Sequence, residues 1–496
     1  MLYCLFKIAS LQPNIFEMRR RSFIQKAGLL GAGLMASDLV SFAAPAFSGP
    51  SSTFPTVRTP LASRHFSSKA VESAITEFSA KVKNKEMAWL FNNCFPNTLD
   101  TTVTYTENAG KPDTYVITGD IDAMWLRDST AQVWPYLPFL KKDKPLKNLV
   151  NGVINHQVKC ILKDPYANAF YNDPNKVGEW KNDVTDMKPG LHERKWEIDS
   201  LCYPIRLAYR YWKETNDTTP FDADWQASVK LTLKTFKEQQ RKENDGPYSF
   251  QRHTSWATDG VPMMGYGYPV KPVGLICSTF RPSDDATVYS FLVPSNFFAV
   301  VSLKQAAELF RAIKADEQTA KELDALAIEV QDALQKYAVF NHEKFGKVYA
   351  FEVNGMGSYN MMDDANIPSL LALPYLGAVP ADDPIYQNTR KMIHSLDDNP
   401  FFFKGTAAEG IGGPHIGKDM IWPMSIIARG LTSSDDKEIK LCLDMLQKCH
   451  GDTGFMHESF HKNDPKKFTR AWFAWTNTIF GEFLWKTYKE RPHLLA

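Results

Sequence analysis

Carboxylic acids stand beside aromatic, basic or glycine residues in four short stretches of this sequence. The stretches are TGDIDAMWLRD at 118–128, FRPSDDA at 280–286, MMDDAN at 361–366 and GFMHES at 454–459. Hydrolysis of a glycosidic bond needs two carboxyl groups, one to protonate the leaving oxygen and one to act as base or nucleophile. A single aspartate in such a stretch is more often a helix N-cap or a turn residue. Four of these stretches together favour a sugar-binding pocket that contains catalytic acids.

The last of these stretches also permits a different chemistry. His457, Glu458 and His461 form the H-E-x-x-H pattern of zinc proteases, and Glu482 lies downstream at a spacing that suits a third ligand. Zinc binding by this pattern requires both histidines on one face of a helix. Glycines precede the pattern and Pro465 follows it closely, which argues against a helix of sufficient length. A zinc metalloprotease stays as an alternative, which metal analysis would decide.

The composition narrows the class of protein further. The formal net charge of the 496 residues is +1, which gives no electrostatic basis for binding nucleic acid or an anionic membrane surface. The phosphate-binding pattern GxxxxGK[ST] and the nucleophile pattern GxSxG are both absent from the sequence. Pro414, directly after the glycines at 410–413, would interrupt the helix that a dinucleotide site needs. We therefore expect no nucleotide cofactor and no nucleic-acid partner.

The N-terminal segment has the features of an export signal. Consecutive arginines at 19–21 precede an apolar run at 27–36, and the small residues Ala-Pro-Ala follow at 44–46. These three features together form a secretory signal, and the paired arginines suggest the Tat route. No later stretch approaches the length of a membrane span, so we expect a periplasmic protein without a membrane anchor after signal removal. The expected division is a signal at 1–46, a linker at 47–66 and a catalytic domain at 67–496.

The chain beyond the signal is predicted to be mainly helical. Apolar residues recur at helical spacing at 70–82, 224–240, 297–313 and 319–337, and we predict an amphipathic helix for each. Alternation of apolar and polar residues is clearest at 347–353, which we predict to be a strand. The sequence therefore predicts an all-α dominated protein with short β segments in its loops.

Stretches rich in Gly, Pro, Trp, Asp and Arg separate the helical regions. They lie at 118–136, 196–212, 274–296, 349–368, 405–424 and 454–481. The interval from each stretch to the next suits one helical hairpin and a loop. Six hairpins whose loops meet at one end of a ring form an (α/α)6 toroid, or barrel, with a concave site where the loops converge. The four acid-bearing stretches all fall within these six, so we expect their acids to meet at that site.

The motifs in these stretches closely resemble glycoside hydrolase family 125. The resemblance rests on TGDI…MWLRDS at 118–129, GLI…FRPSDDA at 274–286, MDDANIP at 362–368, GGPH at 412–415 and HES at 457–459. It extends over nearly the whole chain beyond the linker. It implies an (α/α)6 barrel and an exo-acting α-1,6-mannosidase that inverts the anomeric configuration. It also implies that the enzyme needs no metal and no cofactor, and that its substrate is a mannose-containing oligosaccharide, either an N-glycan or a mannan.

The resemblance also implies roles for individual residues. The general acid falls in the RPSDDA motif, where we place it on Asp285 with Asp284 as the alternative, and the general base falls on Glu458. Motif membership and side-chain chemistry add a sugar-covering aromatic residue, Trp125. They also add a set of polar substrate contacts, which are Arg127, Asp128, Arg281, Asp364, Asn366 and His415.

An inverting mechanism places a demand on the geometry of the two acids. A water molecule must fit beside the base, so the two carboxyls of an inverting enzyme stand about 6.5–9.5 Å apart, against about 5 Å in a retaining enzyme. Two alternatives stay open besides the protease. One is another glycosidase or a phosphorylase on the same toroid, which dependence on phosphate would reveal. The other is a glycan-binding protein without catalytic activity.

Overall fold

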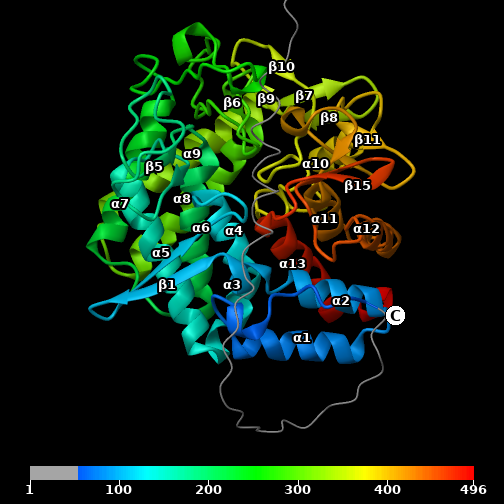
Figure 1. The fold of residues 1–496 in the computed structure, drawn as a ribbon. Coiled ribbons are helices and arrows are strands. Elements are labelled where there is room, and N and C mark those ends of the chain that lie inside the picture. Colours follow the sequence, from blue (N-terminus) through cyan, green and yellow to red (C-terminus); the bar gives the residue numbers. More distant parts are fainter. Residues whose placement is uncertain (1–53, 496) are drawn as a thin grey trace, which may run out of the picture. The chain divides into compact units, whose positions relative to one another are not determined.

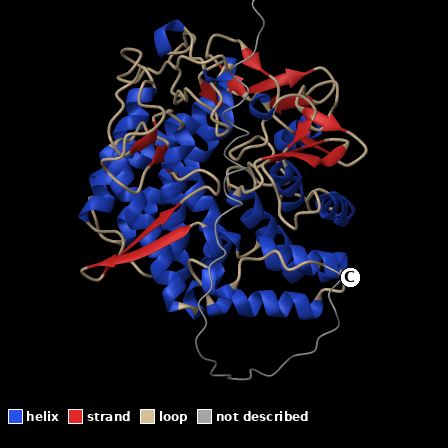
Figure 2. Ribbon diagram, in the orientation of Figure 1, coloured by secondary structure: helices blue, strands red, loops and turns tan. Residues whose placement is uncertain are grey.

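Helices dominate the part of the chain that the structure, a computed structural model, describes, which is residues 54–495 (Figure 1, Figure 2). The α-helices are α1 (Lys69–Lys81), α2 (Lys85–Cys94), α3 (Asn97–Thr101), α4 (Leu126–Val133), α5 (Lys144–Lys163), α6 (Ile198–Thr215), α7 (Ala223–Gln239), α8 (Val293–Ala312), α9 (Glu317–Tyr337), α10 (Pro384–Ile393), α11 (Pro423–Leu431), α12 (Asp436–Lys448) and α13 (Ala474–Glu490). The 3-10 helices are η1 (Leu61–Ser63), η2 (Trp134–Lys142), η3 (Ala257–Asp259), η4 (Met263–Gly265), η5 (Pro414–Ile416) and η6 (Pro492–Leu495).

The helices form an inner and an outer layer of a toroid. Helices α4, α6, α8, α11 and α13 are buried over most of their surface, as expected for an inner layer. Within this layer α11 contacts α13, α13 contacts α4, α4 contacts α6, and α6 contacts α8. On the outside, α5 packs on α4, α7 on α6, α9 on α8, α12 on α11, and α2 on α13. This alternation confirms the expected (α/α)6 fold.

An (α/α)6 fold has six inner positions, and five are occupied by the helices named above. The sixth is occupied by a segment of turns between α9 and α10 in the sequence. Residues 371–377 form consecutive turns in place of a regular helix. Arg206 of α6 donates a hydrogen bond to the carbonyl oxygen of Tyr375 at 3.1 Å. From the outer layer, the hydroxyl of Tyr386 in α10 donates to the carbonyl oxygen of Leu371 at 2.9 Å. The segment is therefore held between an inner and an outer helix, as a regular inner helix would be.

Short antiparallel sheets tie the loops together. They are β1 (Val103–Asn108) with β2 (Lys111–Val116); β3 (Met124–Trp125) with β4 (Ala169–Phe170) and β5 (Leu191–Glu193); β6 (Phe291–Leu292) with β9 (Glu352–Val353) and β10 (Tyr359–Asn360); β7 (Val339–His342) with β8 (Gly346–Tyr349); β11 (Phe402–Lys404) with β12 (Glu409–Ile411); and β13 (Met420–Ile421) with β14 (Ser459–His461) and β15 (Asp464–Thr469). Strands β3, β6 and β13 end where the inner helices α4, α8 and α11 begin. The sheets therefore hold the loops at the N-terminal ends of the inner helices.

The four predicted helices are confirmed, with differences at their first residues. Helices α1 and α7 lie where the amphipathic patterns predicted them. Helix α8 begins earlier than predicted, at Val293, because Pro294 lies in its first turn, where a proline fits. Helix α9 begins at Glu317 because the Asp316 carboxylate accepts a hydrogen bond from the backbone N–H of Gln318 and so caps the helix.

The strand predicted at 347–353 is two strands. Strand β8 ends at Tyr349 and pairs with β7, whereas β9 begins at Glu352 and pairs with β6 and β10. The chain changes sheets between these two residues. The alternating pattern correctly indicated extended backbone, but it carried no information about which partners the strand would have.

The N-terminal predictions fall mostly outside the described residues. The expected signal at 1–46 lies there entirely, so the signal and the domain boundaries stay predictions. The described part of the expected linker, 54–66, is packed on the helical domain: Arg58 is 8% exposed and donates to Asp100 at 2.7 Å. In the described range, no helix is both long and apolar enough to cross a membrane.

Candidate active site

The four acid-bearing stretches meet at the N-terminal ends of the inner helices. Direct hydrogen bonds or ion pairs join them. The contacts are Arg127 Nη2 to Asp284 Oδ1 at 3.3 Å, Ser283 Oγ to Asp364 Oδ2 at 3.0 Å, and Arg470 to both Thr118 Oγ1 at 3.3 Å and Glu458 Oε1 at 3.4 Å. Segments that lie far apart in the sequence, from Thr118 to Arg470, therefore form one site. This agrees with the expected convergence of the loops at one end of the toroid.

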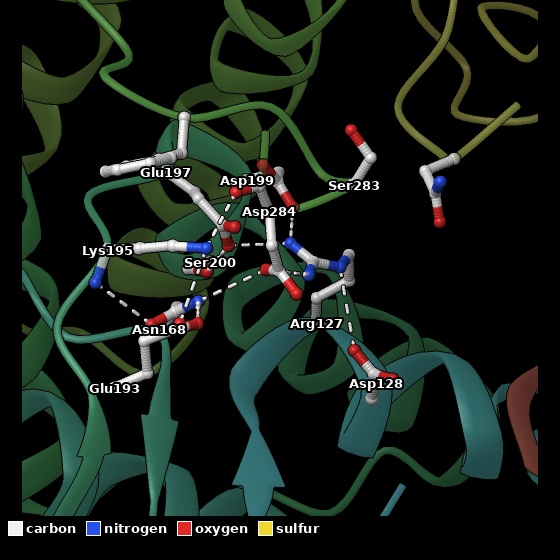
Figure 3. Close-up of polar contacts among 12 residues, drawn as sticks. Arg127, Asp128, Asn168, Glu193, Lys195, Glu197, Asp199, Ser200, Ser283 and Asp284 are labelled. Atoms are coloured by element: carbon white, nitrogen blue, oxygen red, sulfur yellow. Dashed lines mark hydrogen bonds and ion pairs between the residues drawn. The ribbon is translucent and has the colours of Figure 1, made fainter. Parts of the chain in front are cut away.

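A buried arginine lies at the centre of this polar network (Figure 3). Arg127, in the first turn of α4, is 3% exposed and donates to Glu197 at 2.6 Å, Asp199 at 3.1 Å and Asp284 at 3.3 Å. A buried charge is stable only when it is paired, so these acids hold the guanidinium in place. The motifs of the sequence contain Arg127 and Asp284 but neither Glu197 nor Asp199. Their signal was present, because both acids lie at the start of the stretch at 196–212. That stretch, expected to separate helical regions, is mostly helix α6, and Asp199 lies in its first turn.

The neighbouring aspartates of the RPSDDA motif face different surroundings. Asp284 has a φ of 68°, in the left-handed region that residues other than glycine seldom adopt, and its side chain is 25% exposed. The side chain of Asp285 is 1% exposed and lies 3.3 Å from His415 Nδ1. Burial favours a protonated Asp284, but the charges of Arg127 and Lys195 prevail and lower its pKa to about 2. The turn thus directs Asp284 toward solvent and Asp285 into the protein.

His415 connects the aspartate pair with Glu458. Burial lowers the pKa of the imidazole, but the hydrogen bond and charge of Asp285, together with the charges of Glu458 and Asp284, raise it to about 9. The side chain stays 32% exposed, so the ring borders the open part of the site. A single protonated ring therefore lies within the electrostatic reach of all three candidate catalytic carboxyls.

Replacing His415 with glutamine is expected to destabilise the protein more at about pH 6 than at about pH 10. A histidine whose pKa is raised on folding contributes stability that is complete below its ordinary pKa of about 6.5 and is lost as the pH rises through about 9. Urea unfolding of both proteins at the two pH values measures the difference. A destabilisation that is equal at both values would show that the ring is not charged in the folded protein.

Arg470 binds two acids of the site, Glu458 and Asp120. Its Nη1 donates to Glu458 at 3.4 Å and its Nε to Asp120 at 2.9 Å. Burial raises the pKa of Asp128 to about 6, against the opposing charges of Arg127 and Arg470. Asp128 therefore pairs with Arg127 at 3.5 Å, and the charge of Arg470 acts on both Asp128 and Glu458. Arg470 was not predicted as a site residue, because it lies outside every motif named above.

The remaining predicted contacts lie around this centre. Trp125 is 6% exposed, and its indole N–H has no hydrogen-bond partner among the described residues. Asp364 and Asn366 are buried together, with the backbone N–H of Asn366 donating to Asp364 at 3.2 Å. Arg281 is turned toward Glu352, to which it donates at 2.7 Å. The Nε of Arg281 is therefore engaged by Glu352 beside the aspartate loop.

The H-E-x-x-H pattern does not form a helix. His457 lies in a loop and His461 at the end of strand β14. The ring of His457 stacks on Phe468 with 3.7 Å between centroids, and its nitrogens lie 3.1 Å from the carbonyl oxygen of Ala471 and 3.0 Å from the hydroxyl of Thr453. Two histidines on one helical face, which the zinc-protease chemistry requires, are not formed. The zinc-protease interpretation of this motif is therefore wrong.

Removal of metal ions is expected to leave the protein's stability unchanged. The proposed third ligand, Glu482, is buried on α13 and accepts a hydrogen bond from Tyr375 at 2.9 Å, so it is engaged away from both histidines of the motif. Dialysis against EDTA followed by thermal unfolding tests this, with His461→Gln as the matched variant. Stoichiometric zinc in the purified protein, together with a lower Tm after dialysis and in the variant, would contradict it.

Comparison with known proteins agrees with this geometry. The family described as "Metal-independent alpha-mannosidase (GH125)" matches residues 84–485. A protein of Schizosaccharomyces pombe, "Meiotically up-regulated gene 157 protein", is 41% identical over 455 residues, which cover 88% of this chain and 89% of that protein.

Solved structures are similar as well. A Streptococcus pneumoniae structure, described as a metal-independent α-mannosidase in a non-productive complex with α-1,6-mannobiose, is 42% identical. It has a TM-score of 0.83 and covers 86% of this chain and 100% of that one. A bacterial glucoamylase bound to acarbose, 13% identical with a TM-score of 0.51, shares the fold over 85% of this chain and 59% of its own.

Proposed function

Because this chain belongs to the GH125 family of metal-independent α-mannosidases, we propose that it releases terminal, non-reducing α-1,6-linked mannose from glycans with inversion of the anomeric configuration. The substrate complex of the Streptococcus pneumoniae relative contains α-1,6-mannobiose, which supports this linkage. Arg127 pairs with both Asp128 and Asp284, which places two of the proposed sugar-binding acids side by side. An N-glycan and a mannan both present such terminal mannose.

One observation carries the proposal: carboxyls from distant loops share one site. The charges of Asp284, Asp285 and Glu458 all act on His415, although the aspartates precede α8 and Glu458 precedes α13. In the proposed mechanism, Glu458 removes a proton from a water molecule that attacks the anomeric carbon. An aspartic acid on the opposite side protonates the leaving oxygen. Glu458 forms no bond to the sugar.

We place the general acid on Asp284, which the sequence had offered as the alternative to Asp285. The acid must touch the leaving oxygen, and Asp284 is the more exposed of the two, with 25% of its side chain exposed against 1% for Asp285. Asp285 is also engaged by His415 at 3.3 Å. In this assignment Asp285 holds His415 in position. His415 and Asp128 then bind hydroxyl groups of the sugar.

Asp284→Asn is expected to lower kcat on α-1,6-mannobiose by roughly 10²–10⁴-fold, as for loss of a general acid. The loss should be much smaller on 2,4-dinitrophenyl α-mannoside, because that leaving group departs without a proton. Asp285→Asn is the matched variant, with the same change one residue along the chain, and should reduce both rates by similar factors. If instead Asp285→Asn loses activity selectively on the mannobioside and Asp284→Asn does not, the general acid is Asp285.

The linkage is tested with a panel of α-1,2-, α-1,3-, α-1,4- and α-1,6-mannobioses, assayed for free mannose with and without inorganic phosphate. We expect release from the α-1,6 compound at a rate that phosphate does not change. Preference for another linkage would refute the linkage assignment. Mannose 1-phosphate as the product would indicate a phosphorylase, and binding without release would indicate a glycan-binding protein.

A further inference from the structure

A buried lysine donates a hydrogen bond to the backbone of the proposed general acid. Lys195 is 2% exposed, and its ammonium donates to the carbonyl oxygen of Asp284 at 2.8 Å. Figure 3 shows the side chain of Lys195 extended toward Asp284. The same ammonium donates to Asp259 Oδ1 at 2.8 Å and lies 3.4 Å from Glu193 Oε1. An ammonium has three N–H groups, and three acceptors surround this one.

The three acceptors have different functions. A buried charge is stable only when it is paired, and the carboxylates of Asp259 and Glu193 compensate the charge of the ammonium. Both carboxylates are held in turn by Arg252, at 3.5 Å for Asp259 and 2.9 Å for Glu193. The carbonyl oxygen of Asp284 adds no charge to this balance. It is the contact that joins Lys195 to the turn of the general acid.

The backbone of that turn needs support from outside. Asp284 has a φ of 68°, in the left-handed region that residues other than glycine adopt at an energetic cost. Its own N–H donates to the carbonyl oxygen of Arg281 at 2.9 Å, and its carbonyl oxygen accepts from Lys195. Beyond it, the N–H of Ala286 donates to the carbonyl oxygen of Thr258 at 2.7 Å. The left-handed residue is therefore fixed at both of its peptide groups.

We infer that Lys195 is a positioning residue that holds Asp284 in its left-handed conformation and so directs the carboxyl of Asp284 at the leaving oxygen. The inference rests on the proposed glycosidase function and deepens it. The ammonium of Lys195 is buried and occupied by acceptors of the protein, so Lys195 acts through Asp284 and not on the sugar. Without this donor, the backbone can relax to a commoner φ, which turns the carboxyl away from the leaving oxygen.

The test compares two leaving groups in Lys195→Met. Methionine replaces most of the aliphatic chain but donates no hydrogen bond. We expect kcat on α-1,6-mannobiose to fall roughly 10²-fold, the lower end of the range for loss of a general acid. Turnover of 2,4-dinitrophenyl α-mannoside, whose leaving group needs no proton, should change only a few-fold. In the Asp284→Asn background, Lys195→Met should add little, because both changes remove the same function.

Lys163→Met is the matched control. The ammonium of Lys163 also donates to a backbone carbonyl oxygen, that of Pro174 at 3.0 Å, but Pro174 lies outside the turn of Asp284. This variant carries the same chemical change and should keep the wild-type rate on both substrates.

A second pair of variants reaches Lys195 through its carboxylate partner. Asp259→Asn keeps an oxygen that can accept from the ammonium, so it should retain most of the activity on the mannobioside. Asp259→Ala removes that acceptor and lets the ammonium move, so it should lose activity selectively on the mannobioside, though less than Lys195→Met. This pair decides the question if Lys195→Met does not fold.

Three outcomes would overturn the inference while leaving the proposed function intact. Equal losses on both substrates in Lys195→Met would show a merely structural role. A full additional loss in the Asp284→Asn background would show that Lys195 does not act through Asp284. Asp259→Ala that is as active as Asp259→Asn would show that the acid does not depend on a fixed ammonium. Failure of the proposed function is distinct, because the wild-type protein would then release no mannose from either substrate.

Discussion

Glu458→Gln is expected to reduce hydrolysis of α-1,6-mannobiose by roughly 10²–10⁴-fold while leaving binding of the disaccharide nearly unchanged. The amide keeps the size of the carboxylate and a carbonyl oxygen facing Arg470, but it cannot accept the proton of the attacking water. Glu458 is 6% exposed in a loop that precedes α13, so the substitution changes little of the surrounding packing. Turnover by released mannose and binding by calorimetry measure the two effects separately.

A control with the same chemical change makes this test specific. Glu343→Gln replaces an exposed glutamate of the β7–β8 turn, and it should keep the wild-type rate and affinity. Azide added to Glu458→Gln offers a nucleophile that needs no base, and we expect it to restore part of the consumption of an activated mannoside, giving β-mannosyl azide. A Glu458→Gln protein that keeps the wild-type rate would show that the base lies elsewhere.

Arg127→Met is expected to lower the free energy of unfolding by about 3–5 kcal/mol, the range for removing one partner of a buried ion pair. Methionine replaces the aliphatic part of the side chain but leaves Glu197, Asp199 and Asp284 without their shared cation. Unpaired buried carboxyls take up protons, so the deficit should be smaller at about pH 5 than at about pH 7. Urea unfolding at both pH values measures it.

Arg210→Met is the matched control for that prediction. Arg210 lies on the outward side of α6, where it pairs with Glu214 one turn along the helix and its side chain is 47% exposed. Exposed pairs of this kind contribute about 0–1 kcal/mol, so this variant should unfold near the wild-type midpoint. If Arg127→Met is no less stable than Arg210→Met, the carboxyls around Arg127 do not depend on its charge.

The toroid could be predicted from the sequence because its signal is repeated along the chain. Amphipathic helices and polar loops alternate, and no single element decides the fold. The exception is the inner position at 371–377, where turns replace a helix. Contacts from Arg206 and Tyr386 hold that segment, and they come from helices far away in the sequence. No local pattern contains that information.

The candidate site was predictable to the level of its loops but not of its individual acids. The RPSDDA motif contains two neighbouring aspartates. They differ in exposure because the backbone of Asp284 has a left-handed φ, which the sequence does not reveal. Glu197 and Arg470 were missed for a related reason. Glu197 contacts Arg127 and Arg470 contacts Glu458, each partner lying in another part of the chain or beyond a hairpin. Neither Glu197 nor Arg470 stands in a motif that names its chemistry.

If Glu458 activates water for direct displacement at the anomeric carbon, the first product must have the inverted configuration. Proton NMR during hydrolysis of α-1,6-mannobiose follows the anomeric signals before mutarotation equilibrates them. We expect β-mannose to appear first and the α-anomer to grow only with the rate of mutarotation. α-Mannose as the first product would contradict it, because retention requires a carboxylate that bonds to the sugar.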